Sequence, residues 1–192
     1  MRYGTLIIAS AAALALAGCG SKTETTSVDN TTVVTSETDT ANLAVPAPVP
    51  LSPGQTFANA AASSDAFEIA TSQLAQTAST SAAIKAFAGK MISAHTGSTE
   101  KLKTAAAGAS PAITPDPTLT AEQQSTLDAL KTKTGAEFDA AYKAAQVDGH
   151  QKTLDALKAY SASGDVPQLK TFATGLVPTV TAHLNMAKAL KA

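Results

Sequence analysis

The chain contains three histidines, and each continues a row of apolar residues at helical spacing in a different segment. They are His95, His150 and His183, and a fourth segment carries Glu68 in a row of the same kind. A buried carboxylate is costly unless it is paired or coordinates a metal, so a glutamate in this position needs an explanation. The four residues predict a metal centre of three imidazoles and one carboxylate, suited to zinc, copper or iron. The alternative is a buried polar cluster that fixes the helix register.

Residue counting places the four side chains at comparable depth. At about 1.5 Å per residue from the connecting turns, the levels of Glu68 and His95 differ by ~3–5 Å, and those of His150 and His183 by ~6–8 Å. Pro178 cannot donate a backbone hydrogen bond and is expected to kink the last helix one turn before His183. No Glu-x-x-His or His-x-x-x-His spacing occurs, so the ligands would come from four separate helices.

Helical spacing and capping signals predict the elements that carry these residues. Capping boxes are expected at 52–55 (with proline at the first helical position), 120–123 and 134–137, and further helix starts at 79–81 and 165–168. The third helix is expected to break or jog near Gly135. No strand-like alternation competes, and short connections between long helices imply antiparallel neighbours. The pattern predicts an all-α, antiparallel four-helix bundle over residues 53–192.

The first 18 residues predict an export signal. Arg2 precedes an apolar run over residues 6–17 that is too short for a confident membrane span. The run ends in Leu16-Ala17-Gly18-Cys19, which resembles the lipobox of bacterial lipoproteins and would make Cys19 a lipidated N-terminus. Cys19 is the only cysteine, so it has no disulfide partner in the chain. The alternative is a general signal peptide with an incidental cysteine.

Residues 19–52 predict a flexible tether between the lipid anchor and the bundle. Residues 21–40 are mainly Thr, Ser, Asp and Glu, and such a segment cannot bury enough surface to offset its ordering entropy. The spaced prolines that follow, over residues 46–50, favour extended polyproline conformation. Gly20 after the cysteine resembles lipoproteins sent to the outer membrane, so we expect the periplasmic face of that membrane.

Several other functions are disfavoured by composition. The chain has 14 basic and 15 acidic residues with a net charge of −1, and its lysines are scattered, so nucleic acid is not an expected partner. No Gly-x-Ser-x-Gly elbow positions a nucleophilic serine, and no glycine loop is built to hold phosphate.

Four groups of residues carry a family resemblance. They are Phe57, Glu68 and Leu74-Ala75; Lys85-Ala86-Phe87-Ala88, Met91 and His95; Gly135-Ala136-Glu137-Phe138-Asp139, Tyr142 and His150; and Leu169-Lys170-Thr171-Phe172-Ala173, Pro178 and His183-Leu184. In this order, from about Phe57 to Leu190, they resemble the bacterial envelope proteins called "domain of unknown function 4142", often labelled predicted outer membrane proteins.

The resemblance implies a ferritin-like four-helix bundle in the periplasm, with functional positions at Glu68, His95, His150 and His183. The chain departs from the family where an aspartate often precedes the middle two histidines, because Ala94 and Gly149 occupy those positions. If such aspartates orient the ligands, metal affinity here would be reduced. Asp148 is a poor substitute, since it points to another face of the helix.

The leading hypothesis is a lipid-anchored, non-enzymatic bundle that binds a metal ion or senses envelope conditions through the Glu68/His95/His150/His183 layer. A second hypothesis is a structural or protein-interaction module, in which the polar layer serves helix register. A third is a metal-dependent redox enzyme, although a ferritin-like iron store would need more carboxylates than one glutamate. A neutral, buried histidine cluster would also make stability fall as the pH drops through about 6.

Overall fold

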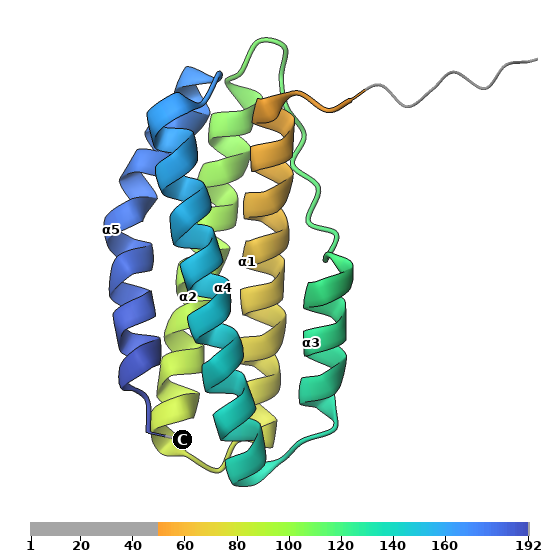
Figure 1. Ribbon diagram of the computed structural model, residues 1–192, viewed down its shortest axis with the longest axis vertical. Helices are drawn as coiled ribbons and strands as arrows, with labels where there is room; N and C mark the ends of the chain where they lie inside the picture. The colour runs from red at the N-terminus through yellow and green to blue at the C-terminus, as the bar shows by residue number, and fades with distance from the viewer. Residues whose placement is uncertain (1–49, 192) are drawn as a thin grey trace, which may run out of the picture. The chain divides into compact units, whose positions relative to one another are not determined.

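The computed structural model describes residues 50–191, and this part of the chain is helical without strands (Figure 1). Its helices are α1 (Pro53–Ala78), α2 (Ala82–Ala107), α3 (Ala121–Lys131), α4 (Gly135–Ser163) and α5 (Pro167–Ala189). The predicted signal segment, Cys19 and all but the last residues of the predicted tether lie outside the described residues. None of the described helices is long and apolar enough to cross a membrane.

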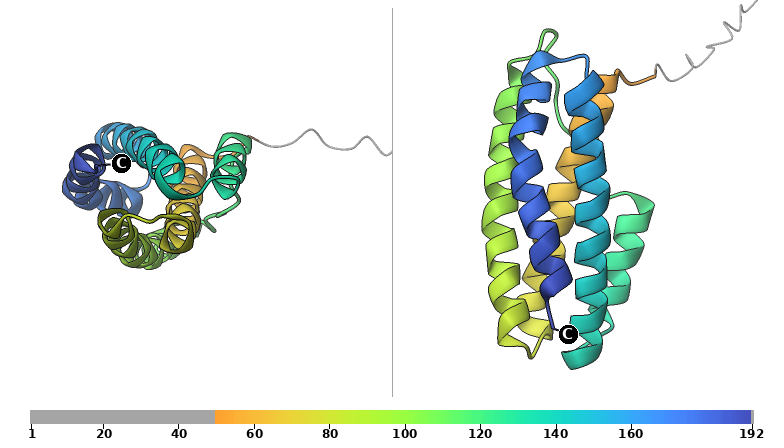
Figure 2. Two further views of the ribbon diagram at one scale, coloured as in Figure 1. Left: turned by 90° about the horizontal axis from the view of Figure 1, so that it is seen from below. Right: turned by 60° about the vertical axis from the view of Figure 1, so that its left-hand side comes forward.

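The four long helices, α1, α2, α4 and α5, lie side by side, as the end-on view in Figure 2 shows. Short turns at 79–81 and 164–166 join α1 to α2 and α4 to α5, so each pair runs in opposite directions. α1 also packs against α4, and α2 against α5. Each long helix therefore contacts two neighbours around one shared interior.

A long connection separates the two helix pairs. The chain leaves α2 at one end of the bundle and returns along its outside to the other end, where α4 begins (Figure 1). α3 lies on this connection and packs outside the four long helices, against α1 and α4. Of the break or jog expected near Gly135, the structure shows a break: α3 ends at Lys131 and α4 begins at Gly135, whose φ of 58° glycine adopts without steric cost.

The helix starts show which local signals form. Ser52 accepts the Gln55 N–H at 3.1 Å, but the Gln55 side chain donates instead to Asn59 and to the Thr114 carbonyl, so the first box is half formed. Thr120 and Gln123 form the full box. Thr134 makes no side-chain cap, so the box expected there is absent.

The last helix begins at Pro167, within the predicted range, and its N-cap residue Val166 makes no side-chain cap. Asp165 accepts a hydrogen bond from the Tyr160 hydroxyl at 2.8 Å. The helix then continues through Pro178 to Ala189.

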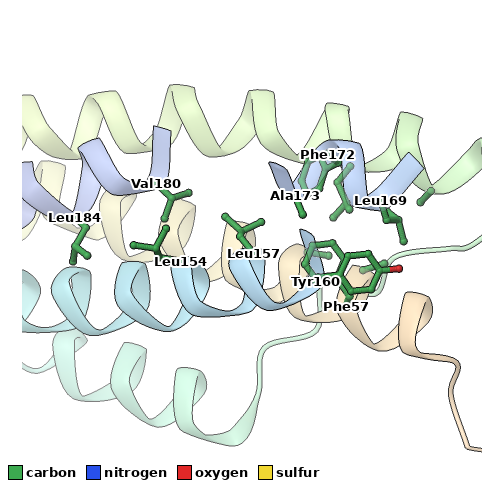
Figure 3. Close-up of a cluster of buried hydrophobic side chains, with 13 residues drawn as sticks. Phe57, Leu154, Leu157, Tyr160, Leu169, Phe172, Ala173, Val180 and Leu184 are labelled. Atoms are coloured by element: carbon green, nitrogen blue, oxygen red, sulfur yellow. The ribbon is translucent and has the colours of Figure 1, made fainter. Parts of the chain in front are cut away.

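Two apolar clusters fill the interior at different heights. The first, drawn in Figure 3, contains Phe57, Ala58, Ala62, Leu102, Ala106, Leu154, Leu157, Tyr160, Leu169, Phe172, Ala173, Val180 and Leu184. Within it the rings of Phe57 and Tyr160 stack with centroids 3.9 Å apart. The second contains Ala75, Ile84, Phe87, Ala88, Met91, Leu130, Phe138, Tyr142 and Ala187. Along α1, α2 and α4, the buried polar residues around Glu68, His95 and His150 fall between the two clusters. His183 on α5 lies between Val180 and Leu184 of the first cluster and meets the other two histidines, so that these residues form one polar layer.

Candidate metal centre

Three helices bring the three histidines together inside this layer. His95 comes from α2, His150 from α4 and His183 from α5, and all three are buried. Their ring centroids are 5.5 Å apart for His95–His150, 5.6 Å for His150–His183 and 5.9 Å for His95–His183. Each ring offers one nitrogen as a ligand atom, and these three nitrogens all lie within 4.8 Å of one another. This spacing allows three imidazoles to hold one ion after a small inward adjustment of the side chains.

The His95 ring is oriented by a carboxylate. Its Nδ1 lies 2.7 Å from Oδ1 of Asp65 on α1, and Thr99 donates to the other oxygen of Asp65 at 3.3 Å. Burial opposes the charged imidazole, but the Asp65 hydrogen bond and the carboxylates of Glu68 and Asp65 outweigh it and raise the pKa of His95. The Nε2 atom of His95 is buried without a partner. A carboxylate behind one ring nitrogen, with the other left free, is the usual arrangement of a metal-binding histidine.

The His150 ring is oriented by its own helix. Its Nδ1 donates to the Gln146 carbonyl at 2.8 Å, one turn earlier in α4. This hydrogen bond places the proton on Nδ1 and leaves a lone pair on Nε2, which is buried without a partner. Burial and the neighbouring His95 charge lower the pKa of His150 to about 4. The ring is therefore neutral at physiological pH, as a metal ligand must be.

His183 completes the group from α5. Its Nδ1 is buried without a partner, and burial, together with the His95 charge, lowers its pKa to about 4. Counting from the turn gave a larger separation between His150 and His183 than the structure has, since their ring centroids are 5.6 Å apart. Long side chains that lean along the helix axis close part of a backbone offset.

Glu68 lies in the layer but not at the convergence point. Its Oε1 is 3.5 Å from Nδ1 of His150, the nitrogen that already donates to Gln146. The group of converging ligand atoms consists of the three histidines, without Glu68. Both oxygens of Glu68 are buried without a hydrogen-bond partner. Burial raises its pKa to about 7, although the His95 charge and the nearby Gln146 side chain act in the opposite direction.

The sequence reasoning missed Asp65, which contacts His95 directly. Asp65 lies three residues before Glu68 and therefore on the same face of α1, and this spacing was the signal that could have found it. Its role matters because Ala94 and Gly149 leave His95 and His150 without a preceding aspartate. An outer carboxylate reaches His95 from another helix instead. Asp148 lies away from the layer, as expected, and pairs with Lys152 at 2.8 Å on the exposed side of α4.

The missing side chain at Gly149 makes room for Glu68. A Cβ atom added at Gly149 would lie 2.7 Å from Oε1 of Glu68, which is closer than such contacts occur. The Glu68 side chain therefore occupies space beside α4 that the Cβ atom of any other residue at position 149 would need.

A small cavity of about 30 Å³ borders the histidines on the side of His95 and His183. All four long helices contribute to its walls, including Ala61 and Asp65, Ala94 and Ser98, Thr153 and Leu157, and Thr179 and Val180. A larger cavity of about 320 Å³ lies under α3, between α1 and α4, and reaches the layer only at Gly149.

Comparisons with known proteins identify the family of this domain. Searches of curated proteins and of solved structures gave no match. A family model described as a domain of unknown function (DUF4142) matches residues 39–190, which confirms the resemblance and extends it to residues before α1. The match covers all five helices and every residue of the polar layer, so this chain belongs to the DUF4142 family.

Proposed function

We propose that this protein is a lipid-anchored envelope protein whose helical bundle binds one metal ion through His95, His150 and His183. The observation that carries the proposal is that each of these rings has a buried nitrogen without a hydrogen-bond partner, and that the three rings offer ligand nitrogens within 4.8 Å of one another. A buried polar atom left unpaired costs about 1–3 kcal/mol, so three at one place are a substantial cost. One ion coordinated by all three would remove that cost.

The ligand set favours zinc or copper. Three neutral imidazoles suit these ions, whereas magnesium and calcium require oxygen ligands. Iron in oxygen-activating sites usually has a carboxylate in its first coordination shell, and Glu68 faces away from the free nitrogen of His150. The arrangement also lacks the several bridging carboxylates of a di-iron store, which supports a binding protein rather than an enzyme.

A purely structural layer explains less of the geometry. The Asp65–His95 pair and the His150–Gln146 hydrogen bond could fix the helix register. They do not account for His183, whose buried Nδ1 has no partner, nor for the free nitrogens of the other two rings. Polar residues kept for register are expected to satisfy one another, and these do not.

Metal analysis of purified, untagged protein tests the proposal. A chain from Gly20 to Ala192, dialysed against zinc or copper and then against buffer, should retain one ion per chain. Because these are the only histidines of the chain, His95→Ala, His150→Ala and His183→Ala should each abolish retention. Asp148→Asn, on the exposed side of α4, should retain the ion. A chain that retains none, or three histidine variants that bind as well as the parent, would contradict metal binding.

The anchor and the ferritin-like arrangement belong to the same proposal. Two antiparallel helix pairs joined by one long crossover are the connectivity of ferritin-like bundles. The Cys19 lipobox and Gly20 support attachment to the periplasmic face of the outer membrane. Full-length Cys19→Ser protein should leave the membrane fraction of the cells that produce it. If the variant stays in that fraction, the protein has another means of attachment.

A further inference from the structure

We infer that the bound ion keeps one coordination position for an exchangeable water molecule, which a small anion can replace through the cavity beside His95 and His183. This inference rests on the proposed metal centre and names the ligand class that the centre accepts. It concerns the position that the three histidines leave open.

Within residues 50–191, three histidine nitrogens converge and no fourth ligand atom joins them. Zinc and copper usually have at least four ligands, and a site with three protein ligands is completed by water or by an exogenous ligand. Glu68 cannot complete the set as it lies, because its Oε1 faces Nδ1 of His150 while the free nitrogen is Nε2. Asp65 cannot complete it either, because its Oδ1 is hydrogen-bonded to Nδ1 of His95.

The cavity supplies the space that such a ligand needs. It has a volume of about 30 Å³, whereas one water molecule needs about 10–15 Å³ measured with the same kind of probe. His95 and His183 line it, so it adjoins two of the three ligands. Ser98 and Thr179 add hydroxyl groups to its wall. The volume suits water or a linear triatomic anion and excludes a ring-sized ligand.

The cavity also reaches the surface of the bundle. Its lining includes Thr179, which is exposed, and Ala94 and Leu176, which are half-buried. A small ligand can therefore enter between α2 and α5 without opening the bundle. On the other side of the layer, Glu68 is buried against Gly149.

Azide titration of the copper-loaded chain tests the inference. Azide bound to Cu²⁺ should give a saturable charge-transfer band, together with a change in the copper EPR spectrum. Asp148→Asn, on the exposed side of α4, should keep this response. Imidazole, which is too large for the cavity, should give no comparable change at the same concentration.

A matched pair of variants identifies the cavity. Ala94→Leu places three extra carbons in the small cavity and should weaken azide binding at least about tenfold while copper remains bound. Ala156→Leu makes the same change beside the larger cavity under α3 and should leave azide binding unchanged. If copper binds stoichiometrically to the parent chain but azide produces no response, the open position is refuted and the metal centre stands. If no copper binds, the proposed function itself fails.

Discussion

Replacing Glu68 by glutamine should stabilise the metal-free protein at high pH and not at low pH. Both carboxylate oxygens are buried without hydrogen-bond partners, and burial raises the pKa of the group from 4.5 to about 7. Between these two values the folded protein keeps the carboxyl protonated, whereas the unfolded chain has it ionised. Raising the pH therefore favours the unfolded state, and this loss is complete above the folded-state pKa.

The size of the effect follows from the shift. Each pKa unit corresponds to about 1.4 kcal/mol, so a shift of roughly two units or more costs the parent protein ~2–3 kcal/mol between pH 5 and pH 8. Glutamine has nearly the same shape and does not ionise. The gain in unfolding free energy from Glu68→Gln should therefore grow by that amount over this pH range.

Urea unfolding in the presence of a chelator measures the difference. The parent chain and Glu68→Gln are compared at pH 5, 6, 7 and 8, so that the titration of His150 and His183, common to both proteins, largely cancels. Glu100→Gln is the control: its partner is Lys103 at the surface, and its stability difference should not vary with pH. A Glu68→Gln difference that is constant from pH 5 to pH 8 would refute the view that Glu68 resists ionisation in the folded protein.

Three further predictions concern the neighbours of Glu68. Burial lowers the pKa of His150 and His183 from 6.5 to about 4, so the stability of the metal-free protein should fall as the pH drops from 6.5 to 4. Urea unfolding should show a smaller fall in stability for His150→Gln than for the parent. An equal fall would count against a buried neutral ring at position 150. Asp65→Asn should weaken metal binding about 10- to 100-fold in calorimetry, because the Asp65 carboxylate orients the His95 ring. An unchanged affinity would show that metal binding does not need the Asp65–His95 contact. Gly97→Ala has open space around the new methyl group and should raise the melting temperature by an amount equivalent to about 0.5–1 kcal/mol. Gly149→Ala should give no such rise, because its methyl group would meet Glu68. Equal gains in melting temperature would mean that the Glu68 side chain moves freely.

The helices and the histidines could be predicted because both depend on local spacing. Apolar rows at helical intervals locate the buried face of each helix, and a polar residue that falls in such a row must be buried with it. This reasoning selected His95, His150 and His183, and the structure brings all three together. Local signals failed at two of the capping boxes. The Gln55 side chain binds Asn59 and the distant Thr114 carbonyl instead of completing the first box, and Thr134 makes no side-chain cap.

The partners of the histidines could not be predicted, because they depend on how far one helix slides along another. Three residues along a helix are about 4.5 Å, which is within the error of counting from a turn. That distance separates Asp65 from Glu68, so counting could not decide which carboxylate meets His95. In the structure Asp65 meets His95, and Glu68 lies beside His150. The predicted set of one carboxylate and three imidazoles therefore becomes three imidazoles with a carboxylate behind two of them.

These two carboxylates have a common electrostatic consequence for the proposed centre. A divalent ion held by three neutral imidazoles brings two positive charges into a region where uncompensated charge is costly. Asp65, 2.7 Å from His95, and Glu68, 3.5 Å from His150, can each supply one negative charge without touching the ion. The loaded layer is then neutral, while in the metal-free protein burial disfavours the charge of the Glu68 carboxylate. A buried glutamate whose charge is disfavoured is hard to explain in a layer that serves only helix register, and it is expected beside a cation.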